Sequence, residues 1–406
     1  MNISPIITDF DDQDAYKFFM QYAAFKQHPD AIVKYKFINR GEHKFPNGFG
    51  EELKKQIEYM KDLRFNSEIE SFFRSEFKTP NGISYFDEGY YGFLRGFRYK
   101  PEQVSIKQYG DELEVEAEGP WIEAIFWETQ VMPIISELYY VMTGQNLKIK
   151  NREERKKHNT LKFQGFITLG VNFADFSLRR RFSKSNQEEM IKDAIKVAPN
   201  NFVGTSNVMF ARKFKIRAIG TQAHEWIMFH AAKYGVDIAN SMAAGKWVDT
   251  FHGALGTALT DTFGSTNFYQ NFGLFYSKLF DGVRHDSGCP LKFTDMTVAH
   301  YKSMGINPLH KLIVFSDGIN SFDKIKSIVE NAFNKIKSSF GIGTWLGNDV
   351  GVSAMNMVIK LFWVRVNETR PWVPCVKLGD GDGGKAMGGT NEAIEMYKKE
   401  INYEQS

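Results

Sequence analysis

Between residues 165 and 349 the chain repeats one pattern, a short apolar run that ends in small or polar residues and leads into a helical stretch. Parallel β/α units produce this pattern, because right-handed crossovers place the carboxyl ends of all strands on one side of the sheet. Seven such ends favour a β/α barrel, where they surround one mouth, over an open doubly wound sheet with a single switch point. The runs are GFITLGVNFADFSLRRRF (165–182), FVGTSNVMFARKF (202–214), IRAIGTQAHEWIMFHAAK (216–233), LGTALTDTFGS (255–265), DGVRHDSG (281–288), HKLIVFSDG (310–318) and SSFGIGTWLGND (338–349).

The segments on either side of these runs have a mixed helix and strand pattern. We therefore predict an α/β chain with two domains: a barrel at 151–351, and a second α/β domain at 1–150 that the tail at about 352–406 completes. The elements expected outside the barrel strands are a helix at 12–27, a strand at 31–40, helical residues at 49–76, a strand at 112–119, a buried helix at 122–144 that kinks at Pro133, a solvated helix at 151–158 and alternation after 352.

The composition excludes several classes of protein. The 406 residues include 51 Lys plus Arg against 48 Asp plus Glu, a net charge of +3 without a basic tail or stripe, so we expect no nucleic-acid partner. Two cysteines, Cys289 and Cys375, cannot build a disulfide framework and indicate a reducing compartment. The chain shows neither a secretory signal nor the ~20 apolar residues of a membrane helix, so we expect a cytoplasmic enzyme without a membrane partner.

Three consecutive arginines, Arg179, Arg180 and Arg181, follow the first run. Guanidinium groups near a strand end form a cradle for phosphates or a carboxylate, because arginine binds both in a bidentate manner. The alternative is a solvated helix start with one arginine in a salt bridge. In either case at least one of the three side chains points away from the site.

Small and acidic residues end two later runs. Gly341 and Gly343 allow backbone N–H groups to approach a phosphate closely, and the Thr344 hydroxyl adds a donor, although a structural tight turn fits equally well. Asp317, which precedes Gly318, has the chemistry to hold ribose hydroxyls or a magnesium ion. An Asx turn or a helix cap is the alternative for this aspartate.

The run at 281–288 places Arg284 and Asp286 on one side of a strand and His285 on the other, by the alternation of a β-strand. We therefore expect Arg284 and Asp286 to be functional and His285 to be structural. Asp286 is a candidate for the same ribose or magnesium contacts as the other strand-end aspartate, with capping again the alternative.

His224 follows a glycine-threonine turn at the start of a helical stretch, where an anion near the imidazole is stabilised. Imidazole is also a competent nucleophile toward phosphoryl groups. A core or capping histidine is the alternative. Tyr16 lies in the first predicted helix, where core packing is the ordinary role of an aromatic residue. Thr205 and Ser206 precede another predicted helix at a strand end.

These segments together resemble the nicotinate phosphoribosyltransferases of the bacterial and fungal type over nearly the whole chain. Any one segment is modest support, whereas all of them in order are highly specific. The residues that carry the resemblance are TDFDDQDAYKFFMQYA (8–23), YKFINR (35–40), EGPWIEAIFWE (118–128), ADFSLRRRFS (174–183), GTSNVMFARKFKIRAIGTQAHEW (204–226), ALTDTF (258–263), GVRHDSGCP (282–290), LIVFSDG (312–318), FGIGT (340–344) and VIKL (358–361).

The resemblance implies a type II phosphoribosyltransferase fold, an irregular β/α barrel plus an α/β domain made from both termini. It implies a reaction of nicotinate with phosphoribosyl pyrophosphate that yields nicotinate mononucleotide and pyrophosphate for NAD synthesis. ATP is the expected co-substrate, coupled through a phosphorylated histidine that matches His224, and Mg²⁺ is expected with both phosphorylated substrates. A homodimer with its active site near the subunit interface is also implied.

The resemblance also assigns roles to individual residues. Tyr16 would stack on the nicotinate in the neighbouring subunit's site. Arg179 and Arg284 would contact the nicotinate carboxylate or phosphates, and Asp286 would serve the ribose and magnesium side. We further expect substrate contacts from Thr205, Ser206 and Thr344, and a 5′-phosphate site formed by Asp317, Gly318, Gly341 and Gly343. The magnesium ligands themselves remain unassigned.

Several residues depart from the family pattern. Cys289 stands where an aspartate is usual, which puts the magnesium or ribose contacts in question. Ser177 replaces a usual glycine before the arginines, Trp345 and Gly347 change the segment after the glycine loop, and the glycine-rich tail leaves the place of Lys385 open.

Three other functions remain open at this stage. A nicotinamide- or quinolinate-using enzyme of the same fold differs in the charge of its pocket. A non-catalytic homologue that senses nucleotide or sugar phosphate would have no need for phosphotransfer at His224. Without the resemblance, an aldolase-like enzyme with a barrel lysine is also plausible, and Lys360 is its candidate.

Overall fold

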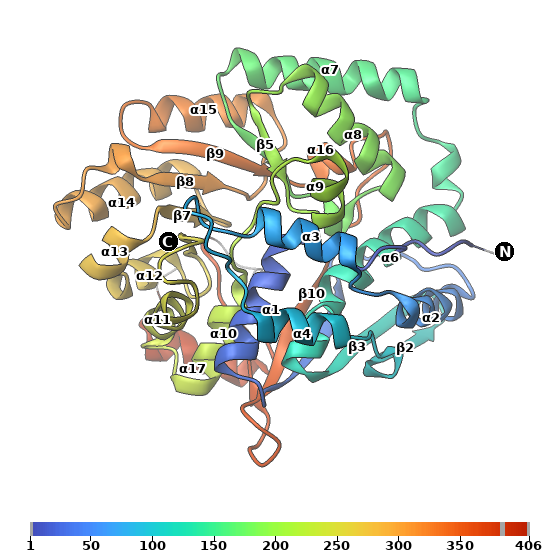
Figure 1. Cartoon of the computed structure of the whole chain (residues 1–406), viewed down its shortest axis with the longest axis horizontal. Helices are drawn as coiled ribbons and strands as arrows, with labels where there is room; N and C mark the ends of the chain where they lie inside the picture. The colour runs from blue at the N-terminus through green and yellow to red at the C-terminus, as the bar shows by residue number, and fades with distance from the viewer. Residues whose placement is uncertain (1–2, 382–385, 404–406) are drawn as a thin grey trace.

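The computed structural model describes residues 3–381 and 386–403 and contains two main β-sheets (Figure 1). Six parallel strands form the larger sheet in the order β5-β4-β9-β8-β7-β6. Each of these strands comes from one of the apolar runs between 165 and 349. Their bounds are β4 (Phe173–Asp175), β5 (Phe202–Thr205), β6 (Thr257–Leu259), β7 (Gly282–His285), β8 (Leu312–Phe315) and β9 (Lys337–Ile342).

The remaining run, at 216–233, bridges the two edge strands β5 and β6. The Thr205 N–H donates to the carbonyl of Arg217 (3.1 Å), and the Ile219 N–H donates to the carbonyl of Thr205 (2.8 Å). On its other side, Thr221 Oγ1 donates to the carbonyl of Thr257 in β6 (2.9 Å). The seven runs therefore follow one another around a ring in chain order. This arrangement confirms the predicted α/β class and explains why the barrel is irregular, since one of its seven positions is an extended segment.

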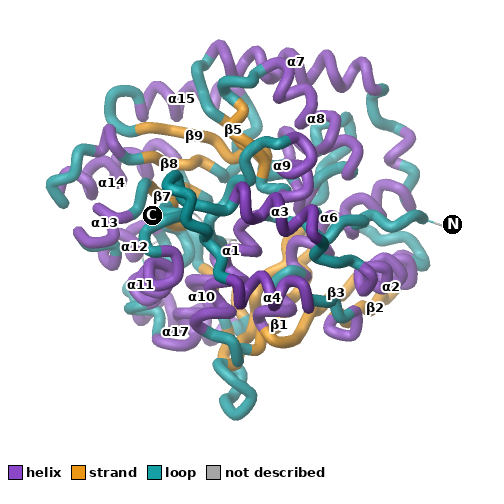
Figure 2. The backbone as a smooth tube through the Cα atoms, viewed as in Figure 1, coloured by secondary structure: helices purple, strands orange, loops and turns teal. Residues whose placement is uncertain are grey.

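The second sheet is antiparallel and draws on both ends of the chain. Its order is β11-β10-β1-β3-β2, and its strands form a group separate from those of the barrel (Figure 2). Residues 357–365 of β10 pair with residues 32–39 of β1 across the centre of this sheet. The bounds are β1 (Ile32–Asn39), β2 (Val104–Tyr109), β3 (Glu112–Pro120), β10 (Met357–Arg365) and β11 (Val373–Pro374).

Helices cover both sheets. They are α1 (Ala15–Gln27), α2 (Phe49–Tyr59), α3 (Ser67–Glu76), α4 (Glu88–Gly96), α5 (Trp121–Ala124), α6 (Trp127–Met142), α7 (Arg152–Thr168), α8 (Lys184–Val197), α9 (Val208–Phe214), α10 (His224–Tyr234), α11 (Ala239–Phe251), α12 (Ser265–Asn271), α13 (Leu274–Leu279), α14 (Pro290–Ser303), α15 (Phe322–Ala332), α16 (Thr344–Gly347) and α17 (Asn391–Glu400).

The segment predicted as one helix at 122–144 forms two helices, α5 and α6. It breaks between Ala124 and Trp127, whereas α6 continues through Pro133. At the break, the buried ring of Phe126 packs against that of Phe18, with centroids 4.9 Å apart. The predicted helix is therefore two helices with a break before α6, and the kink at Pro133 remains a prediction.

Aromatic packing joins the two domains next to the barrel mouth. The ring of Trp121, in α5, stacks on that of Phe229, in α10, with centroids 4.3 Å apart. Trp226, also in α10, lies 5.8 Å from Trp121. All three side chains are buried. This contact fixes α10, whose first residue is His224, against the antiparallel domain.

The tail also reaches the barrel mouth. Its two short strands, β12 (Val376–Lys377) and β13 (Met387–Gly388), pair with each other. The Leu378 N–H donates to the carbonyl of Thr262 (2.8 Å), and Asp380 accepts hydrogen bonds from the N–H and hydroxyl of Ser265 (2.8 and 2.5 Å). The segment before residue 382 therefore lies across the ends of β6 and β7.

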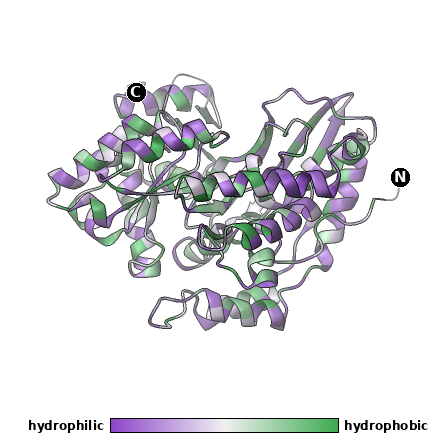
Figure 3. Ribbon diagram, turned by 90° about the horizontal axis from the view of Figure 1, so that it is seen from above, coloured by the Kyte–Doolittle hydropathy of each residue, from purple (hydrophilic) through white to green (hydrophobic). Residues whose placement is uncertain are grey.

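None of the helices in the described ranges is both long and apolar enough to span a membrane. Figure 3 agrees, because hydrophilic and hydrophobic residues are mixed along the helices.

Candidate functional site

The buried side chain of His224 lies at the start of α10 among residues from three other parts of the chain. Its Nδ1 is 3.1 Å from Thr262 Oγ1, and its Nε2 is 3.0 Å from Asp286 Oδ2 and 2.8 Å from Lys377 Nζ. One imidazole nitrogen cannot donate to Asp286 and accept from Lys377 at the same time. With the proton on Nδ1, donated to Thr262, Nε2 keeps the lone pair that a nucleophile needs.

The surroundings of His224 keep its imidazole neutral. Burial, and after it the charge of Lys377, lowers the pKa of His224 to about 4, against the opposing effect of Asp261 and Asp286. At neutral pH the ring is therefore unprotonated, which is the reactive form for attack on a phosphoryl group.

Asp286 follows β7 and connects His224 to the next strand. Its Oδ1 accepts a hydrogen bond from Ser316 Oγ, at the end of β8 (2.7 Å), and its Oδ2 lies 4.0 Å from a guanidinium nitrogen of Arg284. Burial favours the protonated acid, but the charge of Arg284, with smaller effects of the neighbouring His224 and Lys377, outweighs it and holds the pKa of Asp286 well below its usual range. His285 points elsewhere and packs against the rings of Phe293 and Phe315 (5.0 and 5.7 Å), as the strand alternation predicts.

Two members of this cluster are absent from the predicted site residues. Asp261 Oδ2 accepts hydrogen bonds from Ser287 Oγ (2.6 Å) and Lys377 Nζ (3.1 Å). Burial raises the pKa of Asp261, but the charges of Lys377 and His224 lower it to about 2. Asp261 ends one of the apolar runs, so its position was a usable signal. Lys377 gave no such signal, because it arrives from the tail. We call His224, Asp261, Asp286 and Lys377 the His224 group.

The His224 group offers a limited place for a metal ion. Ligand atoms of His224, Asp261 and Asp286 lie within 4.8 Å of one another. The ammonium of Lys377, however, already contacts both His224 Nε2 and Asp261 Oδ2. The oxygens that still fit a magnesium ion are those of the partly exposed Asp286 carboxylate and the buried Oδ1 of Asp261, which has no hydrogen-bond partner among the described residues.

The three consecutive arginines separate into different environments. Arg181 is fully buried and pairs with Asp12 and Glu137 (2.8 and 2.7 Å), so it points away from the site. Arg180 is half-buried. The guanidinium of Arg179 lies 6.0 Å from the ring centre of Tyr16 in the same chain.

Arg179 is held loosely. Its nitrogens lie 3.8 Å from Asp14 and 3.7 Å from Glu128, both longer than a hydrogen bond, and about a third of its side chain is exposed. Lys360 Nζ lies 3.9 Å from Glu128 as well. We call Tyr16, Glu128, Arg179 and Lys360 the Arg179 group. The charge of Asp286 acts on both Arg179 and Lys360, so the two groups lie near enough to interact electrostatically.

Tyr16 lies against the Arg179 of its own chain. Its side chain is buried, and its hydroxyl has no hydrogen-bond partner in the described part of the chain. The stacking on a substrate in a neighbouring subunit remains a prediction.

Thr205 and Ser206 connect the barrel to α1. Thr205 Oγ1 donates to Asp175 Oδ2 (2.8 Å) and accepts from the Asn207 N–H (3.1 Å). The carbonyl of Ser206 accepts from the N–H of Ala15, the first residue of α1 (2.8 Å). The two residues thus hold the helix that carries Tyr16, while their contact with substrate remains a prediction.

The expected 5′-phosphate residues lie at the ends of β8 and β9. Asp317 is half-buried after β8, and Gly318 has a positive φ of 59°, which suits glycine. After β9, Gly343 precedes α16 and Thr344 is its first residue. Gly341 has a packing reason of its own, because a Cβ there would lie 2.3 Å from the ring of Phe176.

The departures from the family pattern fall in different places. A Cβ at Gly347 would lie 2.3 Å from both Cβ and Oγ of Ser177, so the two changes fit each other sterically. Lys162 Nζ donates to the carbonyl of Trp345 (2.5 Å) and lies 5.3 Å from its ring. Cys289 is exposed just before α14. Lys385 lies outside the described residues.

Lys360 does not lie on a barrel strand. It belongs to β10, in the antiparallel sheet, so the aldolase-like alternative loses its candidate lysine. Burial, partly offset by Glu128, lowers the pKa of Lys360 to about 8.

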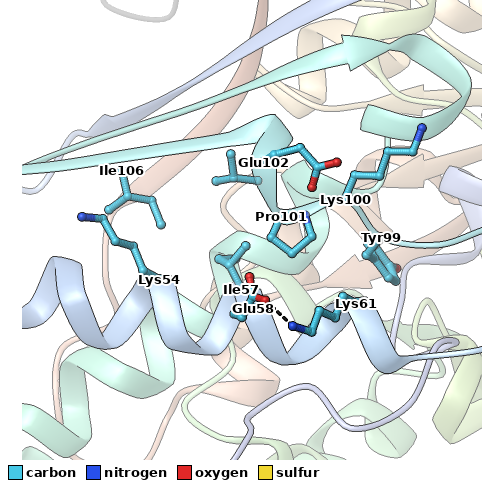
Figure 4. Close-up of a pocket in the computed structure, with 10 residues that line it drawn as sticks. Lys54, Ile57, Glu58, Lys61, Tyr99, Lys100, Pro101, Glu102 and Ile106 are labelled. Carbon is cyan, nitrogen blue, oxygen red and sulfur yellow. Dashed lines mark hydrogen bonds and ion pairs between the residues drawn. The ribbon is translucent and has the colours of Figure 1, made fainter.

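A separate pocket of about 500 Å³ lies between α2 and the start of β2. Figure 4 shows it lined by lysine and glutamate side chains, with Lys61 paired to Glu58. Its lining residues belong to neither the His224 group nor the Arg179 group, so it is not part of the candidate site.

Comparisons with known proteins identify one family. Residues 171–404 match the model of the nicotinate phosphoribosyltransferase family, and residues 12–136 match the N-terminal domain of the same family. The nicotinate phosphoribosyltransferase of Desulforapulum autotrophicum is 43% identical over 95% of this chain and 97% of its own length. That of Chromohalobacter salexigens is 43% identical over 96% of each chain. The crystal structure of the Porphyromonas gingivalis nicotinate phosphoribosyltransferase superposes with a TM-score of 0.92 at 34% identity, covering 98% of this chain and 100% of that one.

Proposed function

Because the chain belongs to the nicotinate phosphoribosyltransferase family, we propose that it joins nicotinate to phosphoribosyl pyrophosphate and forms nicotinate mononucleotide and pyrophosphate. The observation that carries this proposal is the match to family members over almost the full length of both chains, at up to 43% identity. The product would feed NAD synthesis.

The Arg179 group has the chemistry that nicotinate requires. Nicotinate is a flat aromatic anion, and the Tyr16 ring and the loosely held Arg179 guanidinium offer an aromatic face and a partner for the carboxylate. The pyridine nitrogen carries no proton at pH 7, so no general base is needed. Its lone pair forms the bond to the anomeric carbon while the bond from that carbon to pyrophosphate breaks, and pyrophosphate leaves with the electron pair. Catalysis then depends on positioning and on stabilising the leaving group.

The His224 group has the chemistry for coupling to ATP. In this proposal, His224 Nε2 attacks the γ-phosphorus of ATP, the bond to the bridging oxygen breaks, and ADP leaves. Lys377, 2.8 Å from that nitrogen, would hold the transferred phosphoryl group. The phosphorylated enzyme would favour the state that binds the sugar pyrophosphate tightly.

Magnesium would enter with the two phosphorylated substrates. Asp286 and the free oxygen of Asp261 would hold it and would place its charge beside the phosphates.

We also propose that the enzyme is a cytoplasmic homodimer, with no nucleic-acid or membrane partner. The two cysteines support a reducing compartment and the nearly balanced charge supports the absence of a nucleic-acid partner, whereas the homodimer rests on the family resemblance alone.

The test is to incubate the purified protein with Mg²⁺, phosphoribosyl pyrophosphate and either nicotinate or nicotinamide, each with and without ATP. Mononucleotide, ADP and acid-labile protein phosphate are measured together. We expect nicotinate mononucleotide, stimulated by ATP, with the phosphate on His224. Product from nicotinamide alone would overturn the substrate assignment. Ligand binding without any product would support the sensor alternative instead.

A further inference from the structure

Lys17 lies between two buried glutamates from different helices. Its Nζ, on α1, is 2.7 Å from Glu128 Oε2, on α6, and 2.6 Å from Glu225 Oε2, on α10. The Lys17 side chain is completely buried, and those of the glutamates are nearly so. A buried ion held between two opposite charges depends on both, because losing either leaves an uncompensated charge away from water. The three side chains therefore link three helices.

One end of this link reaches the Arg179 group. The second oxygen of Glu128, Oε1, lies 3.7 Å from Arg179 and 3.9 Å from Lys360. These separations are too long for hydrogen bonds but short for buried charges, so Glu128 attracts Arg179 without locking it in place. Arg179 remains free to turn toward an anionic ligand.

The other end reaches His224. Glu225 is the next residue, in the first turn of α10, and its second oxygen accepts long hydrogen bonds of 3.4 Å from Tyr35 and Trp121. The residue that precedes α10, Ala223, makes no side-chain cap hydrogen bond. The Glu225 side chain therefore ties the first turn of α10 to α1, and the bond from Lys17 is shorter than those from Tyr35 and Trp121.

We propose that Lys17, through Glu128 and Glu225, is a positioning residue that couples the Arg179 end of the site to the imidazole of His224. A ligand anion that draws Arg179 away from Glu128 leaves this carboxylate more dependent on Lys17. The ammonium of Lys17 then moves toward Glu128 and away from Glu225. The first turn of α10, which carries Glu225 and His224, shifts as a consequence. The inference rests on the proposed function, since it connects the site for the ring substrate with the site of phosphotransfer. By linkage, each ligand then changes the affinity for the other by the same factor.

The experiment alters one end of the link and measures the function of the other end. The Glu225→Gln variant alters a residue with no contact to Arg179, and the Glu128→Gln variant alters one with no contact to His224. Both keep the size of the side chain and an oxygen that accepts from Lys17. For each variant and for the double variant we measure the KM for nicotinate, the rate of protein phosphorylation by ATP without nicotinate, and the melting temperature. Glu137→Gln is the matched control, because Glu137 is also a buried glutamate of α6 but pairs with Arg181.

We expect each variant to impair the function of the opposite end of the link. Glu225→Gln raises the KM for nicotinate about 5-fold or more, Glu128→Gln slows phosphorylation of His224 by a similar factor, and the effects in the double variant are not additive. Glu137→Gln lowers the melting temperature and leaves both rate measurements unchanged. If each variant affects only its own end, or if all three merely melt earlier, the coupling is wrong while the proposed function stands. If the wild-type protein forms no product from nicotinate, the proposed function fails and the coupling falls with it.

Discussion

The Nζ atom of Lys377 lies 2.8 Å from Nε2 of His224, although 153 residues separate the two in the chain. A cation at this distance disfavours protonation of the imidazole and offers a hydrogen-bond donor where a phosphoryl group would be attached. The same residue is therefore expected to control both the charge of His224 and the fate of its phosphate.

Replacing Lys377 with methionine removes this charge and keeps most of the side-chain volume. We expect the pKa of His224 to rise from about 4 toward its ordinary value, because one of the two largest causes of the lowering is lost. NMR titration of the histidine ring protons measures this shift. The rate of phosphorylation by ATP should fall by about 100-fold, the usual loss for one donor to a developing charge. An unchanged titration and rate would show that Lys377 acts only in packing.

The His224→Gln variant is expected to incorporate no acid-labile phosphate from ATP, because the amide has no nucleophilic lone pair at this position. The His285→Gln variant is the control: His285 lies beside Asp286 in the chain but packs between aromatic rings away from the His224 group. It should keep full labelling for each folded molecule. Labelling of His224→Gln would move the phosphate to another residue.

Replacement by methionine should affect substrate binding at Arg179 and protein stability at Arg181. Arg179→Met is expected to raise the KM for nicotinate at least about 10-fold with little change in stability, because Arg179 is loosely held and partly exposed. Arg181→Met breaks a fully buried ion pair and should cost about 3–5 kcal/mol of unfolding free energy. Steady-state kinetics and denaturant unfolding separate the two effects. A large stability loss in Arg179→Met would contradict the assignment.

Gly347 and Ser177 should show steric coupling. Gly347→Ala places a Cβ 2.3 Å from the Ser177 side chain, and we expect a loss of about 1–3 kcal/mol in unfolding free energy from overpacking. Adding Ser177→Gly removes the clash and should restore most of that loss. Thermal unfolding of both single variants and the double variant completes the cycle, and purely additive effects would refute the pairing.

Stability should fall as the pH drops below 6.5, because buried histidines stay neutral. His28 and His230 face each other with Nε2 atoms 3.3 Å apart. Burial, and after it the charge of His230, lowers the pKa of His28 to about 2, and burial lowers the pKa of His230 to about 3. The unfolded chain binds protons near pH 6.5 and the folded chain does not, so this stability is present above pH 6.5 and declines below it.

For His230 alone, the free energy of unfolding should fall by about 2–3 kcal/mol between pH 6.5 and pH 4.5. Urea unfolding at pH 7, 5.5 and 4.5 measures it. His230→Gln should flatten this dependence, whereas His310→Gln, on the surface, should leave it unchanged. Equal slopes in all three proteins would contradict the assignment.

The sequence by itself determined the barrel. Each of its strands comes from a short apolar run that can be recognised in the local sequence. The seven runs follow one another around the ring in chain order. Even the run at 216–233, which forms no regular strand, keeps its place between β5 and β6. Strand alternation also predicted the opposite directions of His285 and Asp286 without any tertiary information.

The tertiary structure alone decided which distant residues meet. Lys377 reaches His224 because the tail folds back over β6 and β7, and Lys360 enters the site because β10 pairs with β1. Similarly, packing assigned Arg181 to the core and Arg179 to the site, although the two are nearly adjacent. A local sequence pattern predicts burial and secondary structure, but it does not predict a contact with a residue more than a hundred positions away. These contacts become favourable only once the two domains have packed together, and that is why the sequence pattern did not reveal them.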